Sequence, residues 1–210
     1  MARPSRSEIE AFLASEHDPA LYLLLGFPGT GKYTVAQALA ADLSARGSEV
    51  RLVDNHYVDN PIFGIIPTDG ETPLPEGIWG LIEQVRGAIL TAIEEHAPPA
   101  WSFIFTNYIT AQEAGQGSVA ADYLDRLDRL ASRRGCNLNI VRLTCEVDEL
   151  CRRVANPERR ERLKTTSADW AREAAKTYSL YMPAGTRALT LDTTRLSPPE
   201  TARSILEHFG

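Results

Sequence analysis

Residues 23–39, LLLGFPGTGKYTVAQAL, constrain the fold more than any other part of the chain. Apolar residues run into Gly26, and a short loop rich in glycine then leads to Lys32 and an amphipathic segment. A buried strand, a glycine-rich loop and a helix in this order are typical of a loop that binds nucleotide phosphates. The N–H groups of such a loop and of the helix N-terminus together form a site for anions.

The residues after Lys32 depart from the usual pattern G-x-x-x-x-G-K-[ST], because Tyr33 follows the lysine and Thr34 comes one place later. The rival dinucleotide pattern G-x-G-x-x-G also fails, since Thr34 stands where its third glycine belongs. We expect Lys32 to reach the β and γ phosphates. Thr34 either binds Mg²⁺ through its hydroxyl or leaves the ion to water, which Mg²⁺ tolerates. Tyr33 packs beside the nucleotide or against a neighbouring helix. The predicted nucleotide-binding residues are Gly26, Pro28, Gly29, Thr30, Gly31, Lys32, Tyr33 and Thr34.

Short apolar runs alternate with segments of helical periodicity along the rest of the chain, which predicts a parallel sheet with helices on both faces. Residues 55–76 carry four prolines and are expected to form a long loop, and residues 1–18 a short helical arm. Strands are predicted at 20–26, 49–54, 101–107, 137–145 and 187–194, and helices at 32–47, 77–96, 118–135, 147–155, 166–178 and 197–209.

The loop GFPGTGKYT resembles the G-x-P-G-x-G-K-x-T loop of adenylate kinases and related P-loop small-molecule kinases. The stretches LVDNHYVDNPIF and LDTTRLSPPETA look like parts of bacterial P-loop kinase-like proteins known only as ATP-binding. The resemblance implies one domain over residues 1–210, with a five-stranded parallel sheet in a three-layer α/β fold. It also implies an acceptor-side loop and helix over 55–96, an Arg-rich lid over 151–176, ATP as phosphate donor, and Mg²⁺.

Polar residues follow the second and third predicted strands, and ligands of open α/β sheets bind at the carboxyl ends of strands. Asp54 and His56 follow the second strand, and Asn107 follows the third. The resemblance to gluconate kinase and polynucleotide kinase places at Asp54 the acidic residue that meets the acceptor hydroxyl. Asp54 is therefore the candidate base, with capping of a turn as its alternative role. His56 and Asn107 are candidates for acceptor binding, although His56 also suits a packing or surface role.

Basic residues concentrate after the fourth predicted strand, in CRRVANPERRERLK. In P-loop kinases this position belongs to the lid that closes on the transferring phosphate, and guanidinium groups suit phosphate contacts. We expect at least one of Arg153, Arg159 and Arg160 to be catalytic. The alternative is a solvated helix in which Glu158 and Glu161 pair with the arginines.

The distribution of charge bears on the acceptor, because no Lys or Arg lies between Arg51 and Arg86. A nucleoside-monophosphate kinase needs cations in this region for a second phosphate. We therefore expect a small hydroxylated acceptor without phosphate, and the residues NPIFGIIP either line an apolar wall of its site or anchor the loop. Nucleoside-monophosphate kinase activity remains one alternative. Another is a nucleotide-binding regulatory ATPase, which the third strand leaves open because it ends without the acidic residue of a motor ATPase.

Composition limits the other classes of function. The chain of 210 residues is 43% hydrophobic, which suits one globular domain. Its net charge of −6 and its lack of aromatic residues among the basic ones argue against nucleic-acid binding. Its scattered cysteines suit reduced thiols, and neither a signal peptide nor a long apolar run is evident, so we expect a cytoplasmic protein without a membrane partner.

Overall fold

The computed structural model describes residues 18–68, 72, 74–115, 118–182 and 187–210. The predicted helical arm lies outside the described residues, apart from Asp18. Within them, no helix is both long enough and apolar enough to cross a lipid bilayer.

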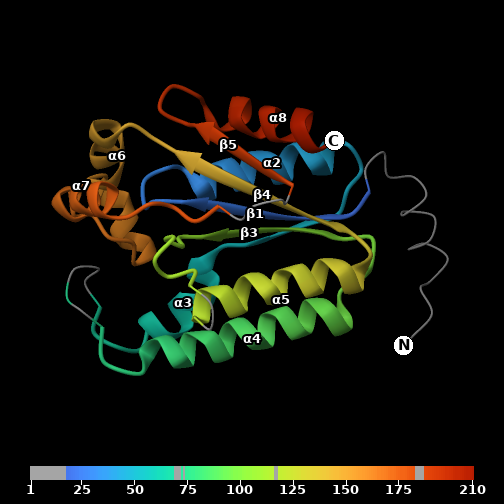
Figure 1. Ribbon diagram of the computed structural model, residues 1–210, viewed down its shortest axis with the longest axis horizontal. Helices are drawn as coiled ribbons and strands as arrows, with labels where there is room; N and C mark the ends of the chain where they lie inside the picture. The colour runs from blue at the N-terminus through green and yellow to red at the C-terminus, as the bar shows by residue number, and fades with distance from the viewer. Residues whose placement is uncertain (1–17, 69–71, 73, 116–117, 183–186) are drawn as a thin grey trace.

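A five-stranded parallel sheet forms the centre of the fold, in the order β2-β3-β1-β4-β5. The predicted strands are confirmed, and so is the α/β class, because helices cover both faces of the sheet (Figure 1). The strands are β1 (Ala20–Gly26), β2 (Val50–Val53), β3 (Ser102–Asn107), β4 (Asn137–Thr144) and β5 (Ala188–Asp192).

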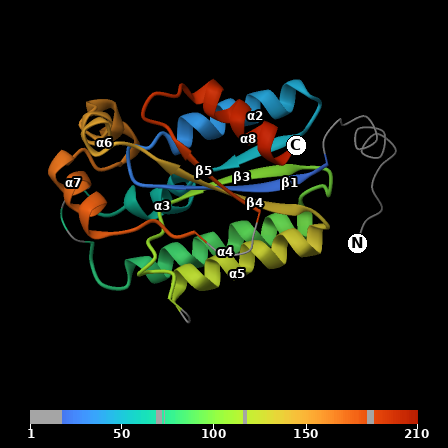
Figure 2. The same ribbon diagram turned by 45° about the horizontal axis from the view of Figure 1, so that its top comes forward.

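The helices fall into three groups. One face of the sheet carries α2 (Lys32–Ala45) and α8 (Pro198–Phe209), and the other carries α4 (Ile78–His96) and α5 (Val119–Arg134). The remaining elements gather at the end of the sheet where β1 runs into its loop, as both views show (Figures 1 and 2). They are α3 (Asn55–Phe63), α6 (Val147–Val154), the 3-10 helix η1 (Pro157–Arg162) and α7 (Ala168–Thr177).

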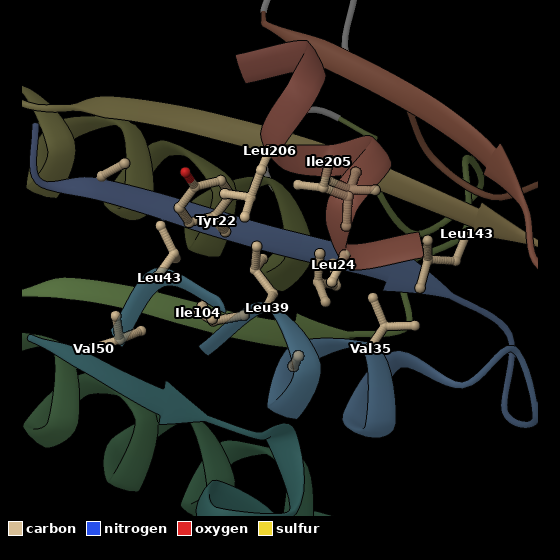
Figure 3. Packing of buried hydrophobic residues seen from close by; sticks show 14 residues of the cluster. Tyr22, Leu24, Val35, Leu39, Leu43, Val50, Ile104, Leu143, Ile205 and Leu206 are labelled. Carbon is tan, nitrogen blue, oxygen red and sulfur yellow. The ribbon is translucent and has the colours of Figure 1, made fainter. Parts of the chain in front are cut away.

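Strand β1 is buried on both sides, and its alternating side chains enter two separate cores. Tyr22 and Leu24 pack with α2 and α8, where Leu39 and Ile205 meet them (Figure 3). The intervening leucines of β1 pack with α4 and α5. Because both cores hold β1 in place, the loop that follows Gly26 starts from a rigid position.

The expected long loop over residues 55–76 is wrong in its first part, because residues 55–63 form α3. Asp54 caps this helix, accepting a hydrogen bond from the His56 N–H at 2.9 Å. Val58 packs against Ile78 and Ile82 of α4. Pro61 made the segment look like a loop, but it lies in the last turn, where tertiary packing outweighs its cost.

Candidate active site

The glycine-rich loop joins β1 to α2 at the carboxyl end of the central strand. Gly29 and Gly31 have φ angles of 96° and 87°, a region that disfavours residues with a side chain. A Cβ atom at Gly29 would also lie 2.8 Å from the Val154 Cγ2 atom of α6. The loop therefore needs glycine at this position for its backbone shape and for its packing against α6.

Lys32 folds back over this loop. Its Nζ donates hydrogen bonds to the carbonyl oxygens of Gly26, at 2.7 Å, and Phe27, at 3.0 Å. Burial, and secondly the nearby ammonium of Lys164, lower the pKa of Lys32 to about 7, against an opposing effect of Asp54. An anion bound in the loop would favour the charged form of Lys32.

The three residues around Lys32 play different parts. Thr30 is buried, and its hydroxyl donates to the Phe27 carbonyl at 2.9 Å, so its side chain stabilises the loop. The Thr34 hydroxyl donates to the Gly31 carbonyl at 2.9 Å at the edge of the cavity. The Tyr33 ring also lines the cavity, and the Lys164 Nζ lies 5.1 Å from its centroid.

A cavity of about 550 Å³ opens in front of the loop and brings distant parts of the chain together. This volume is in the usual range for a small-molecule site. Its lining comes from the loop and α2, from α3, from the start of α4, from the residue after β3, and from η1 and the residues that follow it. The lining residues are Pro28, Gly29, Gly31, Lys32, Tyr33, Thr34, Gln37, Asp54, Asn55, His56, Asp59, Phe63, Trp79, Tyr108, Asn156, Glu158, Arg159, Glu161, Lys164 and Thr165.

Asp54 lines this cavity and is only 2% exposed. Its Oδ2 atom accepts a hydrogen bond from the Thr106 hydroxyl at 3.1 Å, and its Oδ1 atom lies 3.8 Å from the Lys164 Nζ. Asp54 also caps α3, as the alternative interpretation required. The same carboxylate thus faces the cavity and fixes the start of the helix beside it.

His56 and Asn107, the other predicted acceptor residues, are in different places. His56 lines the cavity, with its Nδ1 atom 3.2 Å from Asn60 Oδ1. Burial, and secondly the Lys164 ammonium, lower the pKa of His56 to about 4, so its ring is neutral at pH 7. Asn107 does not line this cavity. It accepts a hydrogen bond from the Tyr108 N–H at 2.8 Å and borders a separate void of about 10 Å³ behind α3.

The three candidate arginines differ in their position relative to the cavity. Arg159 lines the cavity, and its Nε donates to the Thr165 carbonyl at 2.9 Å. Arg153 does not line it, because its guanidinium binds Glu149 and, at 2.8 Å, the Thr193 carbonyl. Arg160 lies outside the lining as well, with its Nε 3.4 Å from the Thr166 hydroxyl. The partner of Arg153 is Glu149, and neither Glu158 nor Glu161 takes that place.

Sequence reasoning missed three kinds of lining residue. Lys164 was one of several cations in the basic segment, and nothing in the sequence singled it out. Asp59 accepts from the Asn55 amide at 3.0 Å, and its four-residue spacing from Asn55 on a helix could have indicated this pair. Burial, opposed by Arg86, raises the pKa of Asp59 to about 6. The aromatic residues Trp79 and Tyr108 complete the set, and Phe63 of NPIFGIIP also lines the cavity.

No known family model matches the chain, and no curated protein matches its sequence. Solved structures do match its fold. A sugar kinase from a Janibacter species is 14% identical, with a TM-score of 0.58 over 90% of this chain and 93% of the other. The APS kinase of Mycobacterium tuberculosis, solved with AMPPNP and APS, is 11% identical, with a TM-score of 0.54 over 91% and 97%.

A gluconokinase from Sinorhizobium meliloti is also similar, at 18% identity, with a TM-score of 0.52 over 92% of this chain and 93% of the other. In all three cases the similarity covers at least 90% of this chain. The chain therefore has the fold of the P-loop small-molecule kinases.

Proposed function

We propose that the protein is an ATP- and Mg²⁺-dependent phosphotransferase that acts on a hydroxyl group of a small acceptor without a phosphate group. The observation that carries this proposal is the position of Asp54. A buried carboxylate and the phosphate-binding loop line the same cavity, with Lys164 close to the carboxylate. A kinase needs these groups together, since it must hold a phosphate chain and receive a proton from the acceptor.

The two sides of the cavity have separate roles in this reaction. The N–H groups of the loop and Lys32 bind the phosphates of ATP. On the other side, Asp54 takes the proton of the acceptor hydroxyl. The hydroxyl oxygen then bonds to the γ phosphorus as the bond from that phosphorus to the bridging oxygen breaks, and ADP leaves. Arg159 and Lys164 are placed to stabilise the negative charge on the transferred group.

The residues present fit a magnesium ion that keeps most of its water. Thr34 donates its hydroxyl hydrogen to Gly31, which leaves the oxygen lone pairs for a cation. Asp54 supplies a carboxylate in the same cavity. Mg²⁺ is commonly held by one or two protein oxygens together with substrate phosphates and water. When bound, the ion would neutralise charge on the phosphates of ATP.

The acceptor side offers little for a second phosphate. Arg86, the first cation after Arg51 in the sequence, forms ion pairs with Glu83 and, at 3.8 Å, with Asp59. It borders the small void behind α3 and is not among the residues that line the main cavity. This arrangement favours an acceptor without phosphate over a nucleoside monophosphate.

The direct test is to measure ADP release from ATP and Mg²⁺ with and without added acceptors. Thermal-shift screening with a hydroxyl-compound library in the presence of AMPPNP and Mg²⁺ supplies the candidates, because a bound ligand raises the melting temperature. The proposal expects ADP release to depend on one of the compounds that bind. Turnover that is equally fast without any acceptor would instead identify a regulatory ATPase, and preference for a nucleoside monophosphate would identify the other alternative.

A further inference from the structure

We infer that the acceptor carries a flat ring and no anionic group, and that the ring packs on an aromatic wall formed by Phe63, Trp79 and Tyr108. This inference deepens the proposed function and rests on it. It concerns the part of the cavity lined by α3, by the start of α4 and by the residue after β3.

The aromatic wall is assembled from three elements. Phe63 ends α3, Trp79 lies in the first turn of α4, and Tyr108 follows β3. The rings of Phe63 and Trp79 meet edge to face, with centroids 6.3 Å apart. Tyr108 lies against Phe27 of the glycine-rich loop, at 5.3 Å between centroids. Ring contacts of this kind fix the orientation of the side chains.

Trp79 is 58% exposed although it lines a cavity. A tryptophan buries a large apolar area when it is covered, so an exposed ring beside a cavity has surface available for a ligand. The contact with Phe63 holds the ring in place, which lowers the entropy lost when a ligand packs on it. A ring-bearing ligand gains more from such a surface than a flexible polyol does.

The position of the wall suits a ring whose hydroxyl reaches the base. Phe63 belongs to the helix that Asp54 caps, and Trp79 packs against Phe63 from the next helix. Tyr108 follows β3, the strand whose Thr106 hydroxyl binds Asp54. A ligand on the wall is therefore bounded by the same elements that position the carboxylate.

The charges in this part of the cavity argue against an anionic acceptor. Its lining residues are Asp54, Asn55, His56, Asp59, Phe63, Trp79 and Tyr108, and none of these seven is Lys or Arg. Burial keeps the His56 ring neutral at pH 7. Two carboxyl groups, from Asp54 and Asp59, add a repulsion for anions that uncharged or cationic compounds avoid. Of the cavity's cations, Lys32 and Arg159 lie on the loop and on η1, whereas the Lys164 Nζ lies 3.8 Å from Asp54 Oδ1 and is paired with that carboxylate.

Matched pairs of compounds test the inference on the full chain. With AMPPNP and Mg²⁺ saturating, affinities are measured by thermal shift and by tryptophan fluorescence for uridine against ribose, uridine against uridine 5′-monophosphate, and phenyl β-glucoside against gluconate. We expect the neutral ring-bearing member of each pair to bind more tightly. Stacking of one ring on an aromatic side chain corresponds to a gain on the order of tenfold to a hundredfold.

Two variants locate the binding on the wall. Trp79→Ala should weaken binding of the ring-bearing compounds by at least about tenfold and reduce the fluorescence response. Trp101→Phe is the matched control, because Trp101 lies outside the cavity, under the Arg51 guanidinium. Its binding should equal that of the wild type.

Three results would overturn the inference: tighter binding of gluconate, ribose or the monophosphate; no binding by uridine or phenyl β-glucoside; or undiminished binding by Trp79→Ala. The outcome is separable from that of the proposed function. Binding that depends on Trp79 without acceptor-dependent ADP release would refute the kinase proposal and leave the aromatic site. Phosphorylation of gluconate by the Trp79→Ala variant would support the kinase proposal and refute the aromatic site.

Discussion

The two sides of the cavity that we propose for phosphate and for acceptor, called here the phosphate side and the acceptor side, are built in different ways. The phosphate side is one continuous segment, Gly26–Thr34, whose backbone shape and single lysine form the site. The acceptor side brings together residues from α3, α4 and the end of β3, and it depends on side chains. A site made of backbone is fixed by its local sequence, whereas a site made of side chains from several elements depends on how those elements pack.

The segment predicted to form a lid, residues 151–176, belongs to neither type, because residues of it lie near both sides of the cavity. Lys164 follows η1 and lies near both Tyr33 of the phosphate side and Asp54 of the acceptor side. Arg153, one helix earlier, binds the carbonyl oxygens of Thr193 and Thr194.

The largest effect is expected for Lys32→Ala, which should reduce nucleotide-dependent turnover below detection. The hydrogen bonds of the Lys32 ammonium go to two loop carbonyl oxygens, so the variant should fold. Its melting temperature should be no lower than that of the wild type, because a buried cation near Lys164 is removed. Steady-state ADP release and a thermal melt check both points. Turnover that survives would sink the assignment of the phosphate side.

Asp54→Asn should lower kcat by roughly 10²–10⁴-fold, the usual contribution of a general base. ATP affinity should change much less, because the nucleotide binds the other side of the cavity. Asparagine can still accept the His56 N–H, so the cap of α3 and the melting temperature should be kept.

Kinetics with the acceptor found by screening, together with AMPPNP binding, measure the Asp54→Asn variant. A near-normal kcat would remove Asp54 as the base and turn attention to His56. A large loss of affinity for ATP and Mg²⁺ would show that the main role of Asp54 is to hold the metal and not to accept the proton.

Lys164→Met should lower kcat by about 10- to 100-fold, the equivalent of one hydrogen bond to a charged group. Arg153→Gln is the matched lid variant. The Arg153 guanidinium is bound to Glu149 and to the loop after β5. Arg153→Gln should therefore lower the melting temperature and leave kcat close to that of the wild type. A lower kcat for Arg153→Gln than for Lys164→Met would contradict this expectation. It would show that the segment rearranges and brings Arg153 to the phosphate.

Nucleotide affinity should decrease by up to about tenfold for each pH unit above 7, since phosphates favour the charged form of Lys32. Burial lowers the pKa of Lys32 in the ligand-free protein to about 7, so above this pH the neutral form predominates and binding takes up a proton. Isothermal titration at pH 8 in two buffers of different ionisation heat measures the uptake. Lys32→Arg, which stays charged, should show none, and equal uptake by both proteins would contradict the explanation.

The smallest effect is expected for Tyr33→Ser, which should keep ATP binding within about tenfold of the wild type. The loop backbone and Lys32 supply most of the phosphate contact, and the Tyr33 ring faces Lys164. Titration with a fluorescent ATP analogue is sufficient. Complete loss of binding would make Tyr33 part of the nucleotide site, and the phosphate side would then depend on a side chain as well.

Much of the fold could be predicted from the sequence, because each strand and most helices carry their own signal. Ser197 and Glu200 form a capping box at the start of α8, and α5 ends before Gly135, which adopts a left-handed conformation. Helix α3 was missed, since its stability comes from the cap at Asp54 and from contacts with α4 that no local pattern contains.

The sequence by itself determined the parallel sheet, the glycine-rich loop and the place of Asp54 after β2. These features depend on residues close together in the chain, where hydrophobic period, glycine conformation and capping act directly. The tertiary structure was needed to show that Arg159 and Lys164 line the cavity while Arg153 does not, and that Trp79 and Tyr108 line the same cavity as Asp54. These positions depend on how η1, α4 and the end of β3 pack around the sheet. Packing between segments that are remote in the chain leaves no recognisable pattern in the sequence of any single segment.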